Sequence, residues 1–263
     1  MSVALLNGQP ASADDLRALA LVNYGHFTSI QVRDHAVQGI ELHRKRLLTG
    51  TRELFGTDLD FDGVRMQMRA AVADMPDCTL RVTVFSRKFD YRVPAEACEP
   101  DVLVSLAPAS PPRTLPLRVK SFCFQRPLPH IKHVGTFPLF HYRRQAIADG
   151  FDDALFVDDT GLIGEGSIWN LGFWHQGGVV WPQAPALRGT AERMLQMALD
   201  RQGIRQVTRP VILGETSEFE AAFACNAGGI QPIAAIDGTS LDPAHQGISL
   251  LGTAAASWPW EAI

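Results

Sequence analysis

The sequence predicts an α+β fold, and three features of its pattern lead to this prediction. Short stretches rich in β-branched and aromatic residues, such as 24–32, alternate apolar and polar side chains and indicate strands. Stretches with apolar residues three or four positions apart, such as 62–74, indicate helices. The strands come in runs that a few helices interrupt, which is typical of α+β proteins rather than of regular strand–helix alternation.

The individual elements follow from the same periodicities. Leu47, Leu48, Leu54 and Phe55 share one face of a helical segment, and Gly203 ends a helix that opens near Gly189. Helices are expected at about 43–55, 62–74, 140–149 and 189–203. Strands are expected at 24–32, 80–85, 102–107, 115–124, 154–157, 171–175, 179–181, 221–225 and 230–235, where the ordered part of the chain is expected to end.

A proline-rich stretch divides the chain into two expected domains. Pro111 and Pro112 are adjacent, cannot donate hydrogen bonds to a sheet and hold the backbone extended. The prediction is a small N-terminal α+β domain over 1–107, a linker over 108–114, and a large C-terminal domain over 115–263 that carries Lys132.

Composition narrows the class of protein. The chain has 263 residues, 46% hydrophobic and 20% charged, which is the composition of an ordinary globular protein. A net charge of −4 gives no electrostatic case for binding nucleic acid or an anionic membrane. No apolar run is long enough for a membrane helix, and the first eight residues do not resemble a signal peptide. Four scattered cysteines suggest reduced thiols, so we expect a cytoplasmic location.

Lys132 and Glu165 are the first candidates for chemistry. Lys132 lies between apolar neighbours, and a desolvated lysine can attack an aldehyde as the neutral amine. Glu165 lies between two glycines after a predicted strand, where the backbone can approach a ligand closely. A carboxylate beside a pyridine nitrogen keeps that nitrogen protonated. Taken singly, a surface lysine is the better explanation of Lys132, and a turn glutamate is about as good an explanation of Glu165.

A binding site for phosphate is suggested by the stretch that opens the helix after Arg188. Its glycine, hydroxyl and free backbone N–H groups suit an anion at a helix N-terminus. Arg46 could add a bidentate contact, and the glycine turn after the strand at 221–225 could add further N–H donors. The histidines show no zinc-binding pattern, so no metal site is predicted. The candidate cofactor-binding residues are Arg46, Lys132, Glu165, Gly189, Thr190, Ala191, Asn226 and Ala227.

In this order, these residues resemble the class IV aminotransferases that use pyridoxal phosphate. His43-x-x-Arg46-Leu47 is similar to the family's H-x-x-R-L helix, whose arginine binds the cofactor phosphate. Lys132 falls where the family has its Schiff-base lysine. The stretch 153–158 followed by Gly164-Glu165-Gly166-Ser167-x-x-Asn170-Leu171 resembles the family's most specific signature, which assigns Glu165 to the pyridine nitrogen. Leu187-Arg188-Gly189-Thr190-Ala191 resembles its L-P-G-I-T loop, with Arg188 in place of the proline.

The resemblance implies a two-domain, D-amino acid aminotransferase-like subunit (fold type IV) with the cofactor at the domain junction, working as a homodimer. It implies pyridoxal 5'-phosphate held as an imine by Lys132, the catalytic residue, and transfer of an amino group between an amino acid or amine and a keto acid. Phe137 stands where branched-chain members have a tyrosine. The substrate-contact candidates are Tyr24, Phe27, Arg87 and Arg92.

Two other functions stay open at this point. The stretches Ile131-Lys132-His133 and Cys225-Asn226-Ala227 look more like aminodeoxychorismate lyase, a family member that eliminates pyruvate. The altered phosphate loop also allows a cofactor-binding homologue without catalysis. The amino donor, the keto acid and the stereochemistry are not determined by the sequence.

Overall fold

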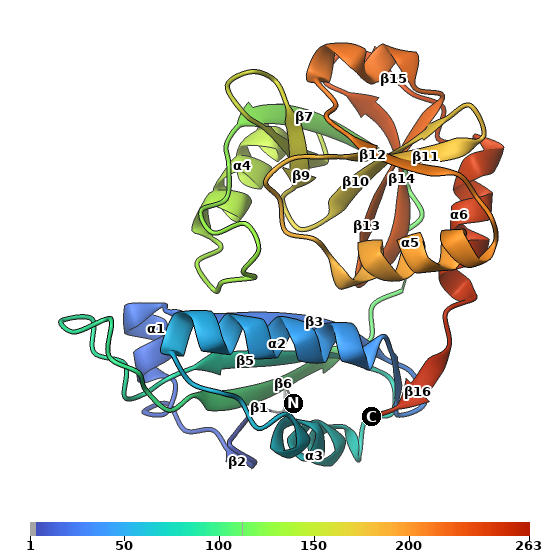
Figure 1. The fold of residues 1–263 in the computed structure, drawn as a ribbon. Coiled ribbons are helices and arrows are strands. Elements are labelled where there is room, and N and C mark those ends of the chain that lie inside the picture. The colour runs from blue at the N-terminus through green and yellow to red at the C-terminus, as the bar shows by residue number, and fades with distance from the viewer. Residues whose placement is uncertain (1–3, 112) are drawn as a thin grey trace. The chain divides into compact units, whose positions relative to one another are not determined.

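The computed structural model of the chain describes residues 4–111 and 113–263. Residues 1–3 of the expected N-terminal domain and Pro112 of the expected linker lie outside the described residues. Two compact units make up the chain (Figure 1). Unit 1 comprises the chain up to Ser110, Ile131–Gly135 and Pro259–Ile263, and unit 2 comprises Pro111–His130 and Thr136–Trp258. The boundary between Ser110 and Pro111 falls within the expected linker.

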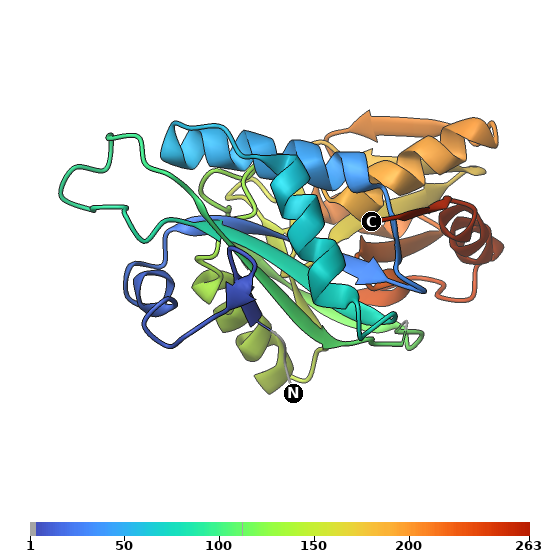
Figure 2. The same cartoon turned by 90° about the horizontal axis from the view of Figure 1, so that it is seen from below.

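Unit 1 is an antiparallel sheet with helices packed on it, and its strand order is β2-β1-β6-β5-β3. Figure 2 shows helices α2 and α3 crossing this sheet, which is drawn in blue to green. A separate two-stranded ladder joins β4 to β16. The strands are β1 (Ala4–Leu6), β2 (Gln9–Pro10), β3 (Gly25–Val32), β4 (Ala36–Gln38), β5 (Cys78–Phe85), β6 (Asp101–Pro108) and β16 (Trp260–Ala262). The helices are α1 (Arg17–Val22), α2 (Ile40–Phe55) and α3 (Phe61–Val72).

Alternation along the strands builds the core of unit 1. On β6, Val102 and Val104 enter the core beneath α2 and α3, whereas Leu103 packs in a smaller cluster on the other face. Leu47 on α2 and Met68 on α3 are both fully buried in the first core. The sheet therefore presents one face to two amphipathic helices, as the sequence periodicity predicts.

Unit 2 is a curled mixed sheet with the order β12-β11-β10-β13-β14-β7-β8-β9, and β15 pairs with β14. Helices α5 and α6 cover one side through a core that includes Trp181, Leu195 and Phe223. The strands are β7 (Leu117–Cys123), β8 (Asp153–Val157), β9 (Ile163–Gly166), β10 (Asn170–His175), β11 (Gly178–Pro182), β12 (Gln206–Arg209), β13 (Ala221–Asn226), β14 (Gly229–Ile236) and β15 (Thr239–Ser240). The helices are α4 (Phe137–Ala148), α5 (Thr190–Arg201) and α6 (Gln246–Ala256), with a 3₁₀ turn at Leu213–Glu218.

The α+β prediction is confirmed, and each predicted helix and strand overlaps an observed one. The prediction that order ends at residue 235 is wrong, because α6 and β16 follow. Helix α6 is rich in alanine and glycine, so its apolar stripe is weak, and only Gly247, Leu251 and Ala254 of it are buried. Every helix of the described residues is too short or too polar to span a membrane.

Candidate functional site

Lys132 lies in a short extended segment that adds to the edge of the unit 1 sheet. The N–H of Phe27 donates to the carbonyl of Lys132 at 2.9 Å, and the N–H of Val134 donates to the carbonyl of Gly25 at 2.9 Å. An antiparallel bridge between His26 and His133 lies between these bonds. The sequence placed Lys132 in the C-terminal domain. It belongs instead with unit 1, because these backbone bonds join its segment to β3.

An aromatic ring lies beside the Lys132 side chain. Its Nζ is 4.9 Å from the centre of the Phe27 ring. The guanidinium carbon of Arg81 is 3.6 Å from the centre of the same ring, and burial lowers the pKa of Arg81. Phe27 is 7% exposed. Contact of a cation with the face of a ring is favourable and helps to hold the lysine in one orientation.

Arg46 lies on α2 beside a buried histidine, one helical turn from it. The Oγ1 of Thr28 lies 2.6 Å from the Nδ1 of His43 and accepts a hydrogen bond from the Nη1 of Arg46 at 3.5 Å. Burial, and secondarily the charge of Arg46, lowers the pKa of His43 from 6.5 to about 3. His43 is therefore neutral at ordinary pH and orients Thr28, which in turn contacts Arg46. Phe27 and Thr28 are consecutive in β3, so Lys132 and Arg46 contact side chains that project from opposite faces of this strand.

We expect the two buried histidines of unit 1 to make the protein sensitive to mild acid. Burial lowers the pKa of His26 from 6.5 to about 4, and that of His43 to about 3. Between pH 7 and pH 5 the unfolded chain takes up protons at both sites while the folded chain does not. The free energy of unfolding should therefore decrease as the pH is lowered from 7 to 5, by about 2 kcal/mol for each histidine.

Denaturant unfolding at pH 7 and pH 5 tests this expectation. The pH-dependent loss should shrink by about 2 kcal/mol in His43→Asn. It should not change in His141→Asn, because His141 is exposed. A loss of equal size in the wild type and in both variants would contradict the assignment.

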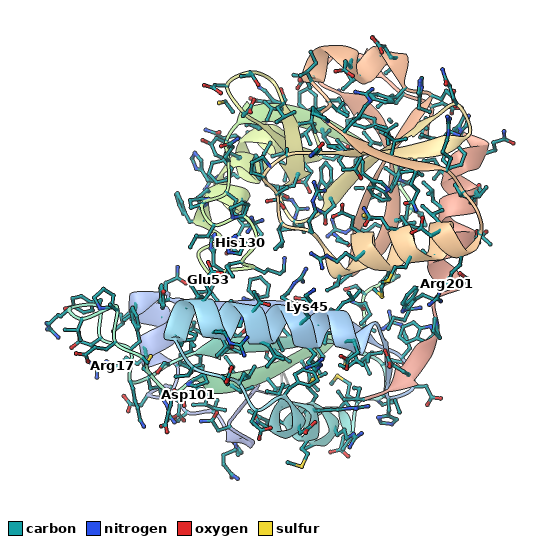
Figure 3. The ribbon with its side chains drawn as sticks, viewed as in Figure 1. Arg17, Lys45, Glu53, Asp101, His130 and Arg201 are labelled. Carbon is teal, nitrogen blue, oxygen red and sulfur yellow. The ribbon has the colours of Figure 1, made fainter. Side chains whose placement is uncertain are left out.

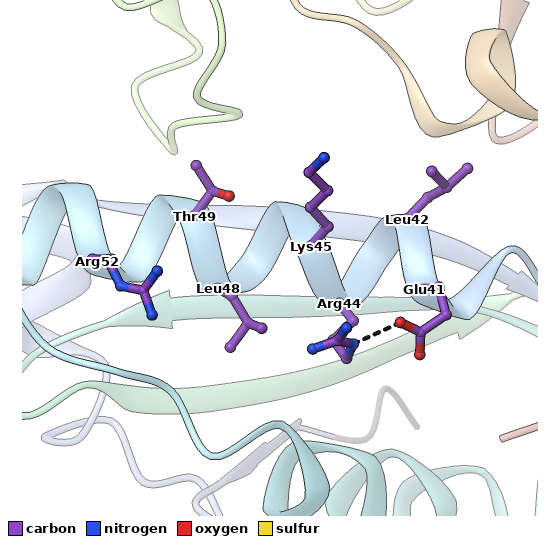
Figure 4. A pocket seen from close by; sticks show the side chains of 7 residues that line it. All are labelled: Glu41, Leu42, Arg44, Lys45, Leu48, Thr49 and Arg52. Atoms are coloured by element: carbon purple, nitrogen blue, oxygen red, sulfur yellow. Dashed lines mark hydrogen bonds and ion pairs between the residues drawn. The ribbon is translucent and has the colours of Figure 1, made fainter.

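A shallow depression runs along the outer surface of α2 and is separate from these contacts. Figure 4 shows the side chains that line it. Two of its cations are already paired, Arg44 with Glu41 at 2.7 Å and Arg52 with Asp58 at 2.5 Å. None of the predicted site residues is among those that line it, so we do not assign it a role. Its lining residues are Glu41, Leu42, Arg44, Lys45, Leu48, Thr49 and Arg52.

Glu165 lies on β9 in unit 2 and forms a buried ion pair. The Nε of Arg126 donates to the Oε1 of Glu165 at 2.8 Å, and the two side chains are 3% and 7% exposed, respectively. Gly166, the next residue, is required: a Cβ there would lie 2.0 Å from the Trp169 ring. The sequence analysis missed Arg126, since no pattern links it to an acid 39 positions away.

The pair borders a small cavity that also touches Gly164 and Phe156. Its volume is about 10 Å³, room for about one water molecule. The cavity is therefore too small to hold an aromatic ring.

The predicted phosphate loop leads into α5 and is fixed by Asn170. The side-chain amide of Asn170 donates to the carbonyl of Leu187 at 2.7 Å, and its oxygen accepts from the N–H of Gly189 at 3.1 Å. A Cβ on Gly189 would lie 2.2 Å from that oxygen, so the close approach requires glycine. Thr190 is the first residue of α5 and is buried, and Ala191 follows it. The asparagine of the glutamate signature thus shapes the start of this helix.

Asn226 lies at the end of β13, next to the same region of unit 2. Strands β10 and β13 are antiparallel neighbours, with Cys225 opposite Asn170. The side-chain amide of Asn226 donates to the carbonyl of Ile168 at 3.4 Å. Its oxygen accepts from the N–H of Gly228 at 2.8 Å, which forms a tight turn containing Ala227. Unit 2 therefore brings together the glutamate signature, the start of α5 and the β13 turn.

The candidates for substrate contacts occupy different settings in unit 1. Arg87 pairs with Asp15 at 2.6 Å and with Asp101 at 3.0 Å; Asp101 is labelled in Figure 3. This geometry favours a structural role for Arg87. Arg92 is exposed, with its guanidinium 4.9 Å from the Tyr91 ring.

Tyr24 is anchored at both ends of its side chain. Its ring stacks on Phe89 with centroids 4.3 Å apart, and its hydroxyl donates to the carbonyl of Leu54 at 3.3 Å. Burial raises the pKa of Tyr24. Phe137, where the resemblance places a tyrosine, is exposed at the start of α4 and stacks on His141.

Comparison with solved structures finds the same fold at low sequence identity. A branched-chain aminotransferase from Thermoproteus uzoniensis, solved with norvaline, matches with a TM-score of 0.84 and 18% identity over 97% of this chain and 94% of that one. The PLP-bound form of a hypothetical aminotransferase from Mycobacterium tuberculosis matches at 0.80 and 18% over 98% of both chains. A candidate 4-amino-4-deoxychorismate lyase from Legionella pneumophila matches at 0.78 and 20%, covering 89% and 90%.

No curated protein matches the sequence significantly. The sequence model of the class IV aminotransferases, in contrast, matches residues 25–236. That span includes Arg46, Lys132, Glu165, Gly189 and Asn226. The chain therefore belongs to the class IV aminotransferase family.

Proposed function

We propose that the protein is an aminotransferase that moves an amino group between an amino acid or amine and a keto acid. Pyridoxal 5'-phosphate is the cofactor indicated by the family and by the PLP-bound structure that shares this fold. The observation that carries the proposal is the family match over 25–236, which spans a lysine, a buried acid and a glycine-led helix start in the family's order.

The residues of the two units fit this cofactor in three respects. Lys132 projects from a strand segment whose position is set by two backbone hydrogen bonds, and its amine lies 4.9 Å from the centre of the Phe27 ring; a lysine amine is the group that bonds to the cofactor aldehyde. Glu165 is a buried acid held by Arg126, which suits a protonated ring nitrogen. Gly189, held by Asn170, precedes a 12-residue helix whose first N–H groups are those of Thr190 and Ala191, and a helix N-terminus suits a phosphate group.

The bound cofactor would supply an electron sink for the carbanion formed at the substrate α-carbon. Lys132 would hold the cofactor covalently until the substrate amine displaces it. The freed amine would then take the proton from the substrate α-carbon and deliver it to the former aldehyde carbon of the cofactor. Glu165 would keep a proton on the ring nitrogen, and Arg126 would fix the orientation of its carboxylate. Arg46 and the N–H groups of Thr190 and Ala191 would bind the phosphate, since the N–H of Gly189 already donates to Asn170 and Glu192.

A lyase that releases pyruvate is the second candidate. It is favoured by the Cys225-Asn226-Ala227 stretch, because Asn226 bonds to Ile168 within the glutamate signature and so would border the same cofactor. Both reactions begin with removal of the same proton, so the residues described above serve either of them.

An absorbance titration with pyridoxal 5'-phosphate tests cofactor binding first. We expect a visible band that changes when a mixture of amino acids is added. Assays for amino transfer to keto acids and for pyruvate release from aminodeoxychorismate then separate the two reactions. A protein that takes up no pyridoxal 5'-phosphate would overturn both candidates and leave a homologue without catalysis.

We further propose a cytoplasmic homodimer. Helix α4 carries three apolar side chains that are at least half exposed, which suits a protein interface: Phe137, Phe140 and Ile147.

The cytoplasmic location is proposed because the cysteines form no disulfide, as in a reducing compartment; they are Cys78, Cys98, Cys123 and Cys225. Light scattering of the purified protein and fractionation of the host cell would test the two statements.

A further inference from the structure

Arg188 links the loop before α5 to the first turn of that helix. Its Nη2 donates to the carbonyl of Pro182 at 2.8 Å and to that of Ala184 at 3.5 Å. Its Nη1 donates to the Oε1 of Glu192 at 2.9 Å. One guanidinium thus joins the end of β11, the loop and the helix. Its planar group of N–H donors reaches all of these acceptors at once, which a lysine amine could not do.

Glu192, the partner of Arg188, is a buried acid at the start of α5. It is 1% exposed, and its Oε2 accepts a hydrogen bond from the N–H of Gly189 at 3.3 Å. Burial raises the pKa of Glu192, and the charge of Arg188 acts against that change. An acid in the first turn stabilises a helix, but an unbalanced one would repel a phosphate at the same N-terminus.

The loop is held from a second direction by Asn170. Asn170 bonds to the carbonyl of Leu187 and to the N–H of Gly189, the residues on either side of Arg188. Asn170 therefore fixes the backbone at this point, while Arg188 fixes the preceding loop and carries the positive charge.

We propose that Arg188 is a positioning residue for the cofactor phosphate: it holds the loop against α5 and balances the charge of Glu192, so that the helix start can accept a dianion. This inference rests on the proposed function, because it takes the phosphate to be that of pyridoxal 5'-phosphate. Arg188 acts through the loop and Glu192 and need not touch the phosphate itself.

Comparing a phosphorylated ligand with an unphosphorylated one tests the proposal. Dissociation constants for pyridoxal 5'-phosphate and for pyridoxal would be measured by absorbance titration of the wild type, Arg188→Met and Arg201→Met. Arg201 lies on the same helix but is exposed in its last turn, so it is the matched control. We expect Arg188→Met to weaken pyridoxal 5'-phosphate binding about tenfold or more, since charge-assisted hydrogen bonds are lost and Glu192 is left unbalanced. Pyridoxal binding in this variant, and both ligands in Arg201→Met, should change less than about twofold.

A double variant separates charge from shape. In Arg188→Met/Glu192→Gln the unbalanced acid is gone, so affinity for pyridoxal 5'-phosphate should recover by several-fold over Arg188→Met. If Arg188→Met does not fold, Arg188→Lys can replace it, because it keeps the charge and loses only the guanidinium hydrogen bonds. Its affinity for pyridoxal 5'-phosphate should fall less than that of Arg188→Met, and still more than its affinity for pyridoxal. Equal losses for the two ligands would overturn the role of Arg188 alone. A wild type that binds neither ligand would overturn the proposed function as well.

Discussion

Lys132→Ala is expected to abolish turnover. Removing the amine eliminates both covalent attachment of the cofactor and the group that moves the proton, and a positioned general base alone contributes about 10²–10⁴ in rate. We therefore expect turnover at least about 10³-fold below the wild type. The visible absorbance that responds to amino acids should also be lost, because it depends on the bond between the cofactor and the lysine.

Two further measurements make the Lys132 result specific. Lys45→Ala removes another lysine from unit 1, one that points outward from α2 in Figure 4, and should leave turnover within about twofold. With both proteins free of cofactor, the melting temperature of Lys132→Ala should stay near that of the wild type, since the backbone bonds to Phe27 and Gly25 do not involve its side chain. Full turnover in Lys132→Ala would remove the basis of the proposed function.

Arg126→Met is expected to be among the most destabilising single substitutions in unit 2. It leaves Glu165, 7% exposed at the side chain, without its cation, and breaking a buried pair from one side costs about 3–5 kcal/mol. The free energy of unfolding, measured with denaturant, should fall by that amount. Turnover should fall too, because the carboxylate would no longer be oriented.

The double variant Arg126→Met/Glu165→Leu separates stability from catalysis. Replacing both charges with apolar groups should restore most of the lost stability, since no buried charge is left unpaired. Turnover should stay low, because the group proposed to protonate the ring nitrogen is missing. Arg52→Met breaks the exposed pair with Asp58 and should cost less than about 1 kcal/mol. An Arg126→Met protein as stable as the wild type would mean that the ion pair is not maintained in solution.

Local periodicity predicted most of the fold because it records which side chains are buried. The alternation over 24–32 and the apolar face over 62–74 reappear as β3 and α3. The elements that were missed are short or weakly patterned. Strand β9 has four residues, two of them glycine, and α6 has few large side chains. Their positions depend on partners far along the chain, which no local window contains.

In the candidate site too, features within a short stretch of sequence could be predicted, whereas contacts between residues far apart in the chain could not. Motifs singled out Arg46, Lys132 and Glu165 as candidates, because each motif is a short stretch of sequence. Arg126 could not be found, because only folding brings it to within 2.8 Å of Glu165. The attachment of the Lys132 segment to β3 was missed for the same reason, since a strand pairing across more than a hundred residues leaves no periodic signal.

The discontinuity of unit 1 has a consequence for biosynthesis. The ribosome releases the strands of the five-stranded sheet first, the Lys132 segment next and β16 only after all of unit 2. Because the nascent chain folds from its N-terminus, the sheet can form with β3 as an open edge. The Lys132 segment is next in the chain and can cover that edge, so the lysine can take its position before most of the unit that carries Glu165 has been synthesised.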